Sequence, residues 1–247
     1  MRGQGVGMNA APKSNGGKIG AALVVGGGIG GMQASLDLAA AGIKVYLIDS
    51  GPCIGGVMAQ LDKTFPTNDC AMCTMAPRLV EVSAHKDIKL ITLAEVDTIT
   101  GEAGSFTATL KIKPRFVDEE KCNGCGACVL VCPIGRIQPS SDKKNPQPLA
   151  DEYNMGLSSR PAIYIPYPQA IPNKAVLDSA NCLYFKTGKC SLCKKVCKVD
   201  AIDFEQKEKP ITLNAGAIIL TPGYELFDAG LKPEYGYGGF KDVLASL

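Results

Sequence analysis

The feature that most constrains this chain is a run of cysteines at short, fixed intervals. The run and the proline that follows it consist of Cys122, Cys125, Cys128, Cys132 and Pro133. The C-x2-C-x2-C-x3-C-P spacing lets thiolates bind the corners of a [4Fe–4S] cluster, and in two-cluster domains the fourth cysteine ligates the other cluster. The run therefore predicts iron–sulfur binding near the middle of the chain.

A second set of cysteines follows at a related spacing, and the two sets form a pseudo-twofold pair. Its members are Cys182, Cys190, Cys193 and Cys197. Because the last cysteine of each run serves the partner cluster, we predict two mixed ligand sets. One [4Fe–4S] cluster is expected on Cys122, Cys125, Cys128 and Cys197, and the other on Cys132, Cys182, Cys190 and Cys193. Zinc is the alternative for the second set.

Cysteine usage and charge also exclude several classes of protein. The chain has 11 cysteines in 247 residues, and residues 1–18 form a predicted disordered tail without the features of a secretory signal. A cytoplasmic protein with cysteine ligands is expected, and no apolar stretch of about 18 residues predicts a membrane span. A net charge of +2, no tryptophan and a single histidine argue against nucleic-acid binding and against chemistry based on several imidazoles.

A glycine-rich turn near the N-terminus predicts a dinucleotide site. It lies between a predicted strand (Ile19–Val25) and a predicted helix (Met32–Ala41), and a second predicted strand (Lys44–Ile48) ends in Asp49. Small residues let backbone N–H groups and the helix N-terminus approach a pyrophosphate, while the acid accepts hydrogen bonds from a ribose. A tight turn without a ligand is the alternative. The expected cofactor contacts are Gly26, Gly28, Ile29, Gly30, Gly31, Asp49, Ser50, Gly55 and Gly56.

Two features favour FAD over a nicotinamide cofactor. Iron–sulfur clusters exchange single electrons, and a flavin converts these into a two-electron step, which a nicotinamide cannot do. The sequence returns to a buried-strand pattern over Ile211–Leu220, and the predicted strand Gly216–Leu220 runs into Thr221, Pro222 and Gly223. This segment resembles the late strand-and-glycine turn that closes over the flavin in two-dinucleotide flavoproteins, so these three residues are expected to contact FAD.

The segments together predict an α/β fold, in which a Rossmann-like FAD-binding domain contains an inserted α+β ferredoxin-like domain for two [4Fe–4S] clusters. Alternating apolar residues over 88–117 add a strand and a β-hairpin. We expect the FAD-binding domain over 19–117, the insert over 118–206 and a return segment over 207–247. A doubly wound domain usually needs more strands than these, so the FAD-binding domain is expected to be incomplete, with its return segment truncated.

The three remaining cysteines lie just after the nucleotide-binding unit. Cys53, Cys70 and Cys73 suit a third [4Fe–4S] cluster whose last ligand is unidentified, with Asp69 as a guess. Alternatively, Cys70 and Cys73 form a redox dithiol beside the flavin, or the thiols are merely structural. Pro77 is expected in the first turn of a helix over Arg78–Ser83, whose N-terminus would stabilise a thiolate or a cluster.

Two further features have both a structural and a functional interpretation. Five lysines crowd the second cysteine set, namely Lys186, Lys189, Lys194, Lys195 and Lys198. They form either an ordinary solvated surface or a positive field that favours the reduced cluster and attracts an acidic electron-transfer partner. His85 is expected at a helix end on the surface.

Several blocks of the sequence resemble the A-subunit of heterodisulfide reductase and its relatives. Besides the glycine fingerprint and the ferredoxin run, the matching blocks are Cys53–Gly56, Leu61–Cys73, Pro77–Val82, Tyr164–Ala170 and Thr221–Tyr224. The resemblance covers nearly all of residues 19–247. A related family is the A-subunit of the quinone-interacting oxidoreductases. Family members continue well past the position that matches Leu247.

The resemblance implies an FAD-dependent oxidoreductase subunit that passes electrons among several [4Fe–4S] clusters. It also implies a multi-subunit cytoplasmic complex with partners similar to the B and C components of heterodisulfide reductase, hydrogenase- or dehydrogenase-type electron donors, and ferredoxin as a candidate. Some members resemble flavin-based bifurcating enzymes. The alternatives are a ferredoxin-type electron-transfer module without flavin chemistry and a dithiol enzyme that resembles thioredoxin reductase and uses Cys70 and Cys73. No catalytic acid or base is expected.

Overall fold

The computed structural model describes residues 14–15, 18–138 and 147–245. Most of the predicted tail over residues 1–18 therefore lies outside the described residues. Within it, strands β1 (Ser14–Asn15) and β2 (Lys18–Ile19) pair as a short antiparallel ladder.

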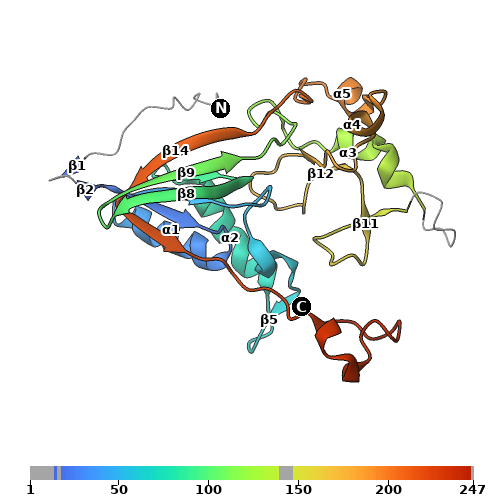
Figure 1. Cartoon of the computed structure of the whole chain (residues 1–247), viewed down its shortest axis with the longest axis horizontal. Coiled ribbons are helices and arrows are strands. Elements are labelled where there is room, and N and C mark those ends of the chain that lie inside the picture. The colour runs from blue at the N-terminus through green and yellow to red at the C-terminus, as the bar shows by residue number, and fades with distance from the viewer. Residues whose placement is uncertain (1–13, 16–17, 139–146, 246–247) are drawn as a thin grey trace.

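The centre of the fold is a four-stranded parallel sheet with the order β15-β3-β4-β7 (Figure 1). Its strands are β3 (Ala21–Val25), β4 (Lys44–Ile48), β7 (Ile88–Ile91) and β15 (Ala217–Leu220). Their sequences are nearly continuous apolar runs, as expected for parallel strands that are covered on both faces. The predicted strand over Lys44–Ile48 is confirmed, and the preceding strand begins at Ala21.

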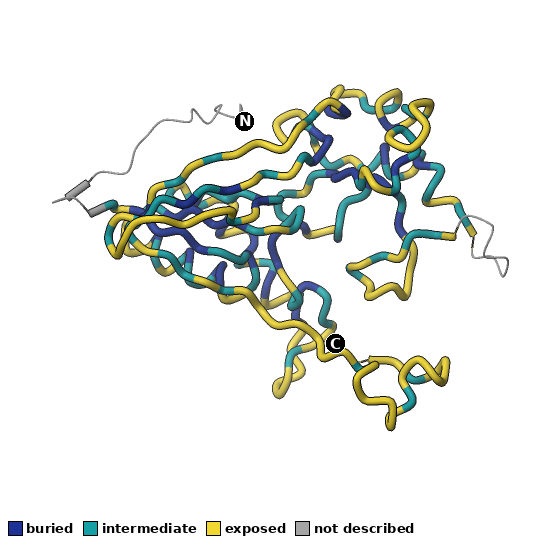
Figure 2. Tube along the Cα trace, viewed as in Figure 1, coloured by how far each residue is buried: buried dark blue, intermediate teal, exposed yellow. Residues whose placement is uncertain are grey.

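Each face of the parallel sheet has its own cover. Helices α1 (Ile29–Ala40) and α2 (Ala71–Ala84) lie on one face, where Met32 and Met75 pack with Val24 and other buried side chains. The other face carries a three-stranded antiparallel sheet of β8 (Ala94–Glu102), β9 (Ser105–Ile112) and β14 (Lys209–Ala215). There Leu110 packs with Leu23. Figure 2 shows the buried residues between these layers, and the predicted hairpin within 88–117 is confirmed as β8–β9.

The prediction of one strand over Ile211–Leu220 is wrong, because the chain changes sheets at Gly216. Strand β14 pairs with β9 in the antiparallel sheet, whereas β15 pairs with β3 in the parallel sheet. A Cβ atom at Gly216 would lie only 2.2 Å from the Ile19 carbonyl oxygen. The bend therefore needs glycine, which a continuous apolar pattern does not reveal.

The predicted helix over Arg78–Ser83 is also wrong in its start. Helix α2 begins at Ala71, and Pro77 lies inside it instead of in its first turn. Proline removes one helical hydrogen bond, but Met75 and Leu79 on either side are fully buried against the sheet. Tertiary packing thus continues the helix through the proline, and the N-terminus moves to Cys70. His85 ends this helix as its C-cap, as expected.

The cysteine-rich part of the chain leaves and returns at one point. The Asp118 N–H donates to the Ala201 carbonyl at 2.7 Å, and the Asp203 N–H donates to the Phe116 carbonyl at 3.1 Å. Between them a separate apolar cluster includes Cys128, Cys132, Cys182 and Cys193. The short elements of this part are α3 (Ala127–Val131), η2 (Pro133–Arg136), β10 (Leu149–Ala150), β11 (Ser159–Arg160), β12 (Ile163–Tyr164), β13 (Val176–Leu177), α4 (Leu183–Thr187) and α5 (Leu192–Val196).

The remaining elements are short and border the main sheet or follow it. They are the 3-10 helices η1 (Gly56–Gln60), η3 (Ala229–Leu231) and η4 (Pro233–Tyr235), and the paired strands β5 (Lys63–Thr64) and β6 (Asp69–Cys70). Within the described part of the chain, every helix is too short or too polar to cross a membrane.

Candidate cofactor sites

A large cavity opens at the carboxyl ends of β3 and β4, where the glycine-rich turn begins. Its volume is about 870 Å³, which lies in the range typical of ligand sites. We call it the nucleotide cavity. Its predicted lining residues are Gly26, Gly28, Ile29, Gly30, Asp49, Ser50, Gly55, Gly56, Thr221, Pro222 and Gly223. Of the predicted FAD contacts only Gly31 is not among the lining residues.

The glycines of the turn serve two different purposes. A Cβ atom at Gly31 would lie 1.8 Å from the Gly26 carbonyl oxygen, so Gly31 lets α1 pack closely on β3. At Gly28, by contrast, a Cβ atom would meet nothing within 4 Å. Gly28 is the N-cap of α1, and the first helical bond runs from the Met32 N–H to its carbonyl. The open space at Gly28 is therefore a cradle in front of free helix N–H groups, which suits a pyrophosphate.

The carboxylate of Asp49, which is predicted to bind a ribose, accepts hydrogen bonds from two backbone N–H groups. One carboxylate oxygen accepts the Gly27 N–H at 2.7 Å and the other accepts the Gly51 N–H at 2.7 Å. An ionised carboxylate has about four lone-pair positions, so hydroxyl donors can still bind. Asp49 thus holds the glycine turn in shape and remains available to a ligand.

Several lining residues of the nucleotide cavity are not predictable from sequence motifs. Val57, Met58 and Leu61 come from η1 and its end, and Glu95 and Val96 come from the start of β8. The alternating pattern of a hairpin strand gives no signal of this kind. Thr221 has a structural role that was also missed, because its hydroxyl donates to the carbonyls of residues 25 and 26, each at 2.9 Å.

The cysteines of the ferredoxin-like part line two small cavities, four cysteines in each. The first cysteine cavity is lined by Cys122, Cys125, Cys128 and Cys197. The second cysteine cavity is lined by Cys132, Cys182, Cys190 and Cys193. Each cavity thus brings together one of the two mixed sets. Among the described residues, no three His, Cys, Asp or Glu side chains come close enough to hold a single metal ion.

Burial controls the ionisation of these thiols when no metal is bound. Burial raises the pKa of Cys128 to about 11, and it raises the pKa of Cys193 to about 12. Cluster ligands are thiolates, so cluster insertion must displace protons from buried thiols. One stabilising contact is present, since the Ala201 N–H donates to the Cys197 sulfur at 3.3 Å.

The structure does not bring the other three cysteines into one cavity. Cys53 is half-buried and lines a third cavity, which we call the tyrosine cavity and which has Tyr153, Tyr164 and Tyr167 but no other cysteine among its lining residues. Burial raises the pKa of Cys53 to about 12.

Cys70 and Cys73 are exposed and form a pair at the start of α2. Cys70 is the N-cap, and its sulfur accepts the Cys73 N–H at 3.2 Å. Hydrogen bonding from Cys73 lowers the pKa of Cys70, and the same side-chain contact raises the pKa of Cys73. A C-x2-C pair of this kind at a helix N-terminus is suited to thiol redox chemistry.

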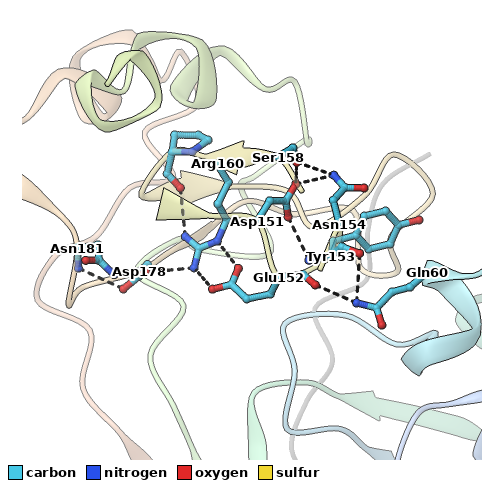
Figure 3. A network of polar contacts seen from close by, with 10 residues as sticks. Gln60, Asp151, Glu152, Tyr153, Asn154, Ser158, Arg160, Asp178 and Asn181 are labelled. Atoms are coloured by element: carbon cyan, nitrogen blue, oxygen red, sulfur yellow. Dashed lines mark hydrogen bonds and ion pairs between the residues drawn. The ribbon is translucent and has the colours of Figure 1, made fainter. Parts of the chain in front are cut away.

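A polar network connects the two kinds of site (Figure 3). Arg160 donates to Glu152 at 2.6 Å and to Asp178 at 3.2 Å, and Asn181 donates to Asp178 at 2.9 Å. The hydrogen bond from Arg160 lowers the pKa of Glu152. Gln60, at the end of η1, donates to the Glu152 carbonyl at 3.0 Å. The network therefore ties η1, which lines the nucleotide cavity, to the segment just before Cys182.

Comparison with known families identifies the class of both sites. Residues 22–81 match the FAD dependent oxidoreductase family, and residues 115–135 match the 4Fe-4S binding domain family. The first match covers the glycine turn and Asp49, and the second covers the first cysteine run. The chain thus combines an FAD-dependent oxidoreductase segment with a 4Fe–4S binding domain in an α/β fold.

Individual relatives are similar to this chain over nearly all of its length. The chain is 46% identical over 225 residues to the iron–sulfur A-subunit of the CoB–CoM heterodisulfide reductase of Methanocaldococcus jannaschii, covering 91% of this chain and 32% of that protein. It is 43% identical to the A-subunit of the H(2):CoB-CoM heterodisulfide,ferredoxin reductase of Methanothermobacter marburgensis, covering 92% of this chain and 32% of the relative. Over 91–92% of its length the chain is thus similar to A-subunits of heterodisulfide reductases. It spans about a third of the length of these relatives.

Proposed function

We propose that the chain is part of an oxidoreductase subunit that moves electrons between FAD and [4Fe–4S] clusters. The observation that carries this proposal is the pair of cavities with four cysteines each, in a chain that also has an 870 Å³ nucleotide cavity. The proposed ligands are Cys122, Cys125, Cys128 and Cys197 for one cluster and Cys132, Cys182, Cys190 and Cys193 for the other. The insert over 118–206 would be the two-cluster domain.

The chain's own residues would hold the flavin cofactor at its pyrophosphate end. Free N–H groups at the start of α1 would bind the pyrophosphate at the open side of Gly28, and Asp49 would accept ribose hydroxyls while keeping its two backbone bonds. Pro222 and Gly223 would close the cavity on the β15 side. A bound flavin supplies the exchange between single electrons and electron pairs.

Two functions remain for the other cysteines. We favour a third [4Fe–4S] cluster at Cys53, Cys70 and Cys73, in line with the family resemblance of this block. A redox dithiol at Cys70 and Cys73 is the second candidate, because both residues are exposed and the Cys70 sulfur already accepts a hydrogen bond from the Cys73 N–H. In that case Cys53 would be a structural thiol of the tyrosine cavity.

The names of the relatives suggest the larger setting. One relative is named for H2, the CoB–CoM heterodisulfide and ferredoxin, and another is named for a heterodisulfide reductase that depends on ferredoxin and F(420)H(2). We propose that this chain likewise works with other subunits of a redox complex, and that its flavin participates in electron bifurcation.

Cofactor analysis of anaerobically purified protein tests the proposal. Three clusters predict about twelve irons and one FAD per chain, two clusters predict about eight irons, and both predict EPR signals after reduction. Cys53→Ser should lower the iron content by about four if the third cluster exists, but should leave it unchanged if Cys70 and Cys73 form a dithiol. Zinc in place of iron at the ferredoxin-type cysteines, or protein that binds no flavin, would refute the proposal.

A further inference from the structure

The nucleotide cavity and the first cysteine cavity are connected through cavities that share lining residues. The residues common to the nucleotide cavity and the tyrosine cavity are Asp49, Ser50, Gly56 and Val57. The tyrosine cavity shares Tyr167 with a neighbouring cavity, which is also lined by Asn173 and Gly124. Gly124 lines the first cysteine cavity as well. The first cysteine cavity therefore lies on the side of the ferredoxin-like part that faces the nucleotide cavity.

One loop runs along this series of cavities. Strands β12 and β13 pair with each other, and residues 165–175 between them form a loop that we call the strap. The Tyr167 hydroxyl donates to the Ile54 carbonyl, and the Ile54 N–H donates to the Ile171 carbonyl at 2.9 Å. Ile54 is fully buried in the core that also contains Val24 of the parallel sheet. The strap is thus fixed to the part of the molecule that forms the nucleotide cavity.

The end of the strap meets the first cysteine run. A Cβ atom at Gly124 would lie 2.6 Å from the Asn173 carbonyl oxygen, so the two backbones approach closely there. The Asn173 side chain donates to the Pro168 carbonyl at 3.1 Å, which ties the end of the strap to its middle. The ammonium group of Lys174 donates to the Cys122 carbonyl. The strap therefore places a cation on the backbone of a proposed cluster ligand.

Lys174 brings its charge to a cavity that has a neutral lining. Apart from the four cysteines, the residues that line the first cysteine cavity have no ionisable side chain. Lys174 directly precedes one of them, Ala175, and is itself half-buried. Salt and water screen a partly buried charge less than an exposed one. A cluster in this cavity would therefore experience the charge of Lys174 strongly.

Two other cations near this cysteine run are paired with carboxylates. Lys121 pairs with Asp118 at 3.6 Å, and its side chain is 56% exposed. The buried Arg115 pairs with Glu119 at 2.5 Å. Among the ion pairs of the described residues, by contrast, none includes Lys174. No carboxylate in contact with Lys174 offsets its charge.

We propose that Lys174 is a positioning residue for Cys122 and that its charge raises the reduction potential of a cluster in the first cysteine cavity. The inference rests on the proposed iron–sulfur function. A cluster gains one negative charge when it is reduced, and net charge, hydrogen bonds and solvent exposure set its potential. A cation held beside a ligand favours the reduced form. Because this cavity faces the nucleotide cavity, a higher potential here would favour electron transfer from the flavin to this cluster.

A redox titration followed by EPR tests this role without relying on enzyme activity. Anaerobic holoprotein is reduced stepwise with dithionite in the presence of mediator dyes, and the midpoint of each cluster signal is recorded. Lys174→Met removes the charge and should lower the equilibrium constant for reduction of the first cluster about tenfold, which moves its midpoint by about 59 mV to more negative values. The midpoint of the second cluster should stay nearly unchanged. Cys125→Ser alters or removes the cluster of the first cavity and so shows which signal belongs to it.

Further variants separate the charge from the hydrogen bond and from the total charge of the protein. Lys174→Gln can still donate to the Cys122 carbonyl but is neutral, so its midpoint should fall as in Lys174→Met. Lys174→Arg keeps the charge and should stay near the wild-type midpoint. Lys121→Met is the matched control, because it removes an equal charge from the residue next to Cys122. That lysine is exposed and paired with Asp118, so the midpoint should change much less.

Three results would overturn the proposal. The first is a wild-type midpoint in Lys174→Gln, which would leave at most the hydrogen bond as the cause of any shift in Lys174→Met. The second is an equal shift in Lys121→Met and Lys174→Met. The third is loss of the first cluster in both neutral variants but not in Lys174→Arg, which would assign the lysine to cluster assembly. If only Lys174→Met lacks the first cluster, the midpoint of Lys174→Gln decides.

The same spectra distinguish failure of this inference from failure of the proposed function. Wild-type protein without cluster signals refutes the proposed function itself. Intact clusters whose midpoints are the same in wild type and in the neutral Lys174 variants refute the role of Lys174 alone.

Discussion

Replacing single glycines of the nucleotide turn should separate folding from cofactor binding. In Gly28→Ala the new methyl group meets no protein atom within 4 Å, and the backbone is already at a φ of −71°, which alanine adopts freely. Loss of unfolded-chain freedom stabilises such a variant by about 0.4–1 kcal/mol, while alanine is a poorer N-cap by a similar amount. The free energy of unfolding of the apoprotein should therefore stay within about 1 kcal/mol of wild type.

The same methyl group should be damaging to flavin binding. It occupies the space in front of the free N–H groups of α1, where the pyrophosphate is expected to lie. Hydrogen bonds to a charged group contribute about 1.5–3 kcal/mol each, so the loss of one of them weakens binding by roughly 10- to 100-fold. Flavin fluorescence titration of the apoprotein measures this affinity directly.

Gly31→Ala is the matched comparison, because its methyl group points into the protein. It would lie 1.8 Å from the Gly26 carbonyl oxygen and 2.7 Å from the Thr221 hydroxyl. Backbone atoms cannot move aside as a flexible side chain can. We therefore expect the free energy of unfolding, measured in urea, to fall by about 3 kcal/mol or more. A Gly28→Ala variant that unfolds as easily as Gly31→Ala, or that binds FAD as tightly as wild type, would contradict this prediction.

Three further predictions concern individual contacts. In the protein interior the Tyr167 hydroxyl donates a hydrogen bond to the Ile54 carbonyl. Tyr167→Phe removes this donor and should lower the free energy of unfolding in urea by about 1–2 kcal/mol. An unchanged urea midpoint would contradict this expectation. The hydrogen bond from Arg160 holds the pKa of Glu152 below the value in the unfolded chain. The stabilisation that this contact gives is therefore present above the unfolded-chain pKa and is lost as the pH falls through the pKa of the folded protein. The stability of Glu152→Gln should accordingly depend less on pH in the acid range, and equal pH profiles for the variant and wild type would contradict this. In metal-free protein a maleimide should modify the exposed Cys70 before the half-buried Cys53, as peptide mapping by mass spectrometry would reveal, and preferential labelling of Cys53 would show that the two environments are reversed.

The local features of the fold could be predicted from the sequence because each depends on neighbouring residues. The strand over Lys44–Ile48 is a short apolar run, and the glycine turn before α1 follows from three closely spaced glycines. The C-x2-C-x2-C-x3-C spacing likewise predicts a metal-binding loop without any knowledge of the rest of the chain. The assignment of the individual ligands stays a prediction.

Only the tertiary structure decided where distant segments meet. Apolar continuity over Ile211–Leu220 suggested one strand, yet close contact with Ile19 makes the chain change sheets at Gly216. Burial of Met75 and Leu79 carries α2 through Pro77 and so puts Cys70 at a helix N-terminus. The sharing of lining residues between cavities could not be read from spacing either. Periodicity and spacing record interactions within a few residues, whereas burial and cavity walls depend on side chains that lie far apart in the sequence.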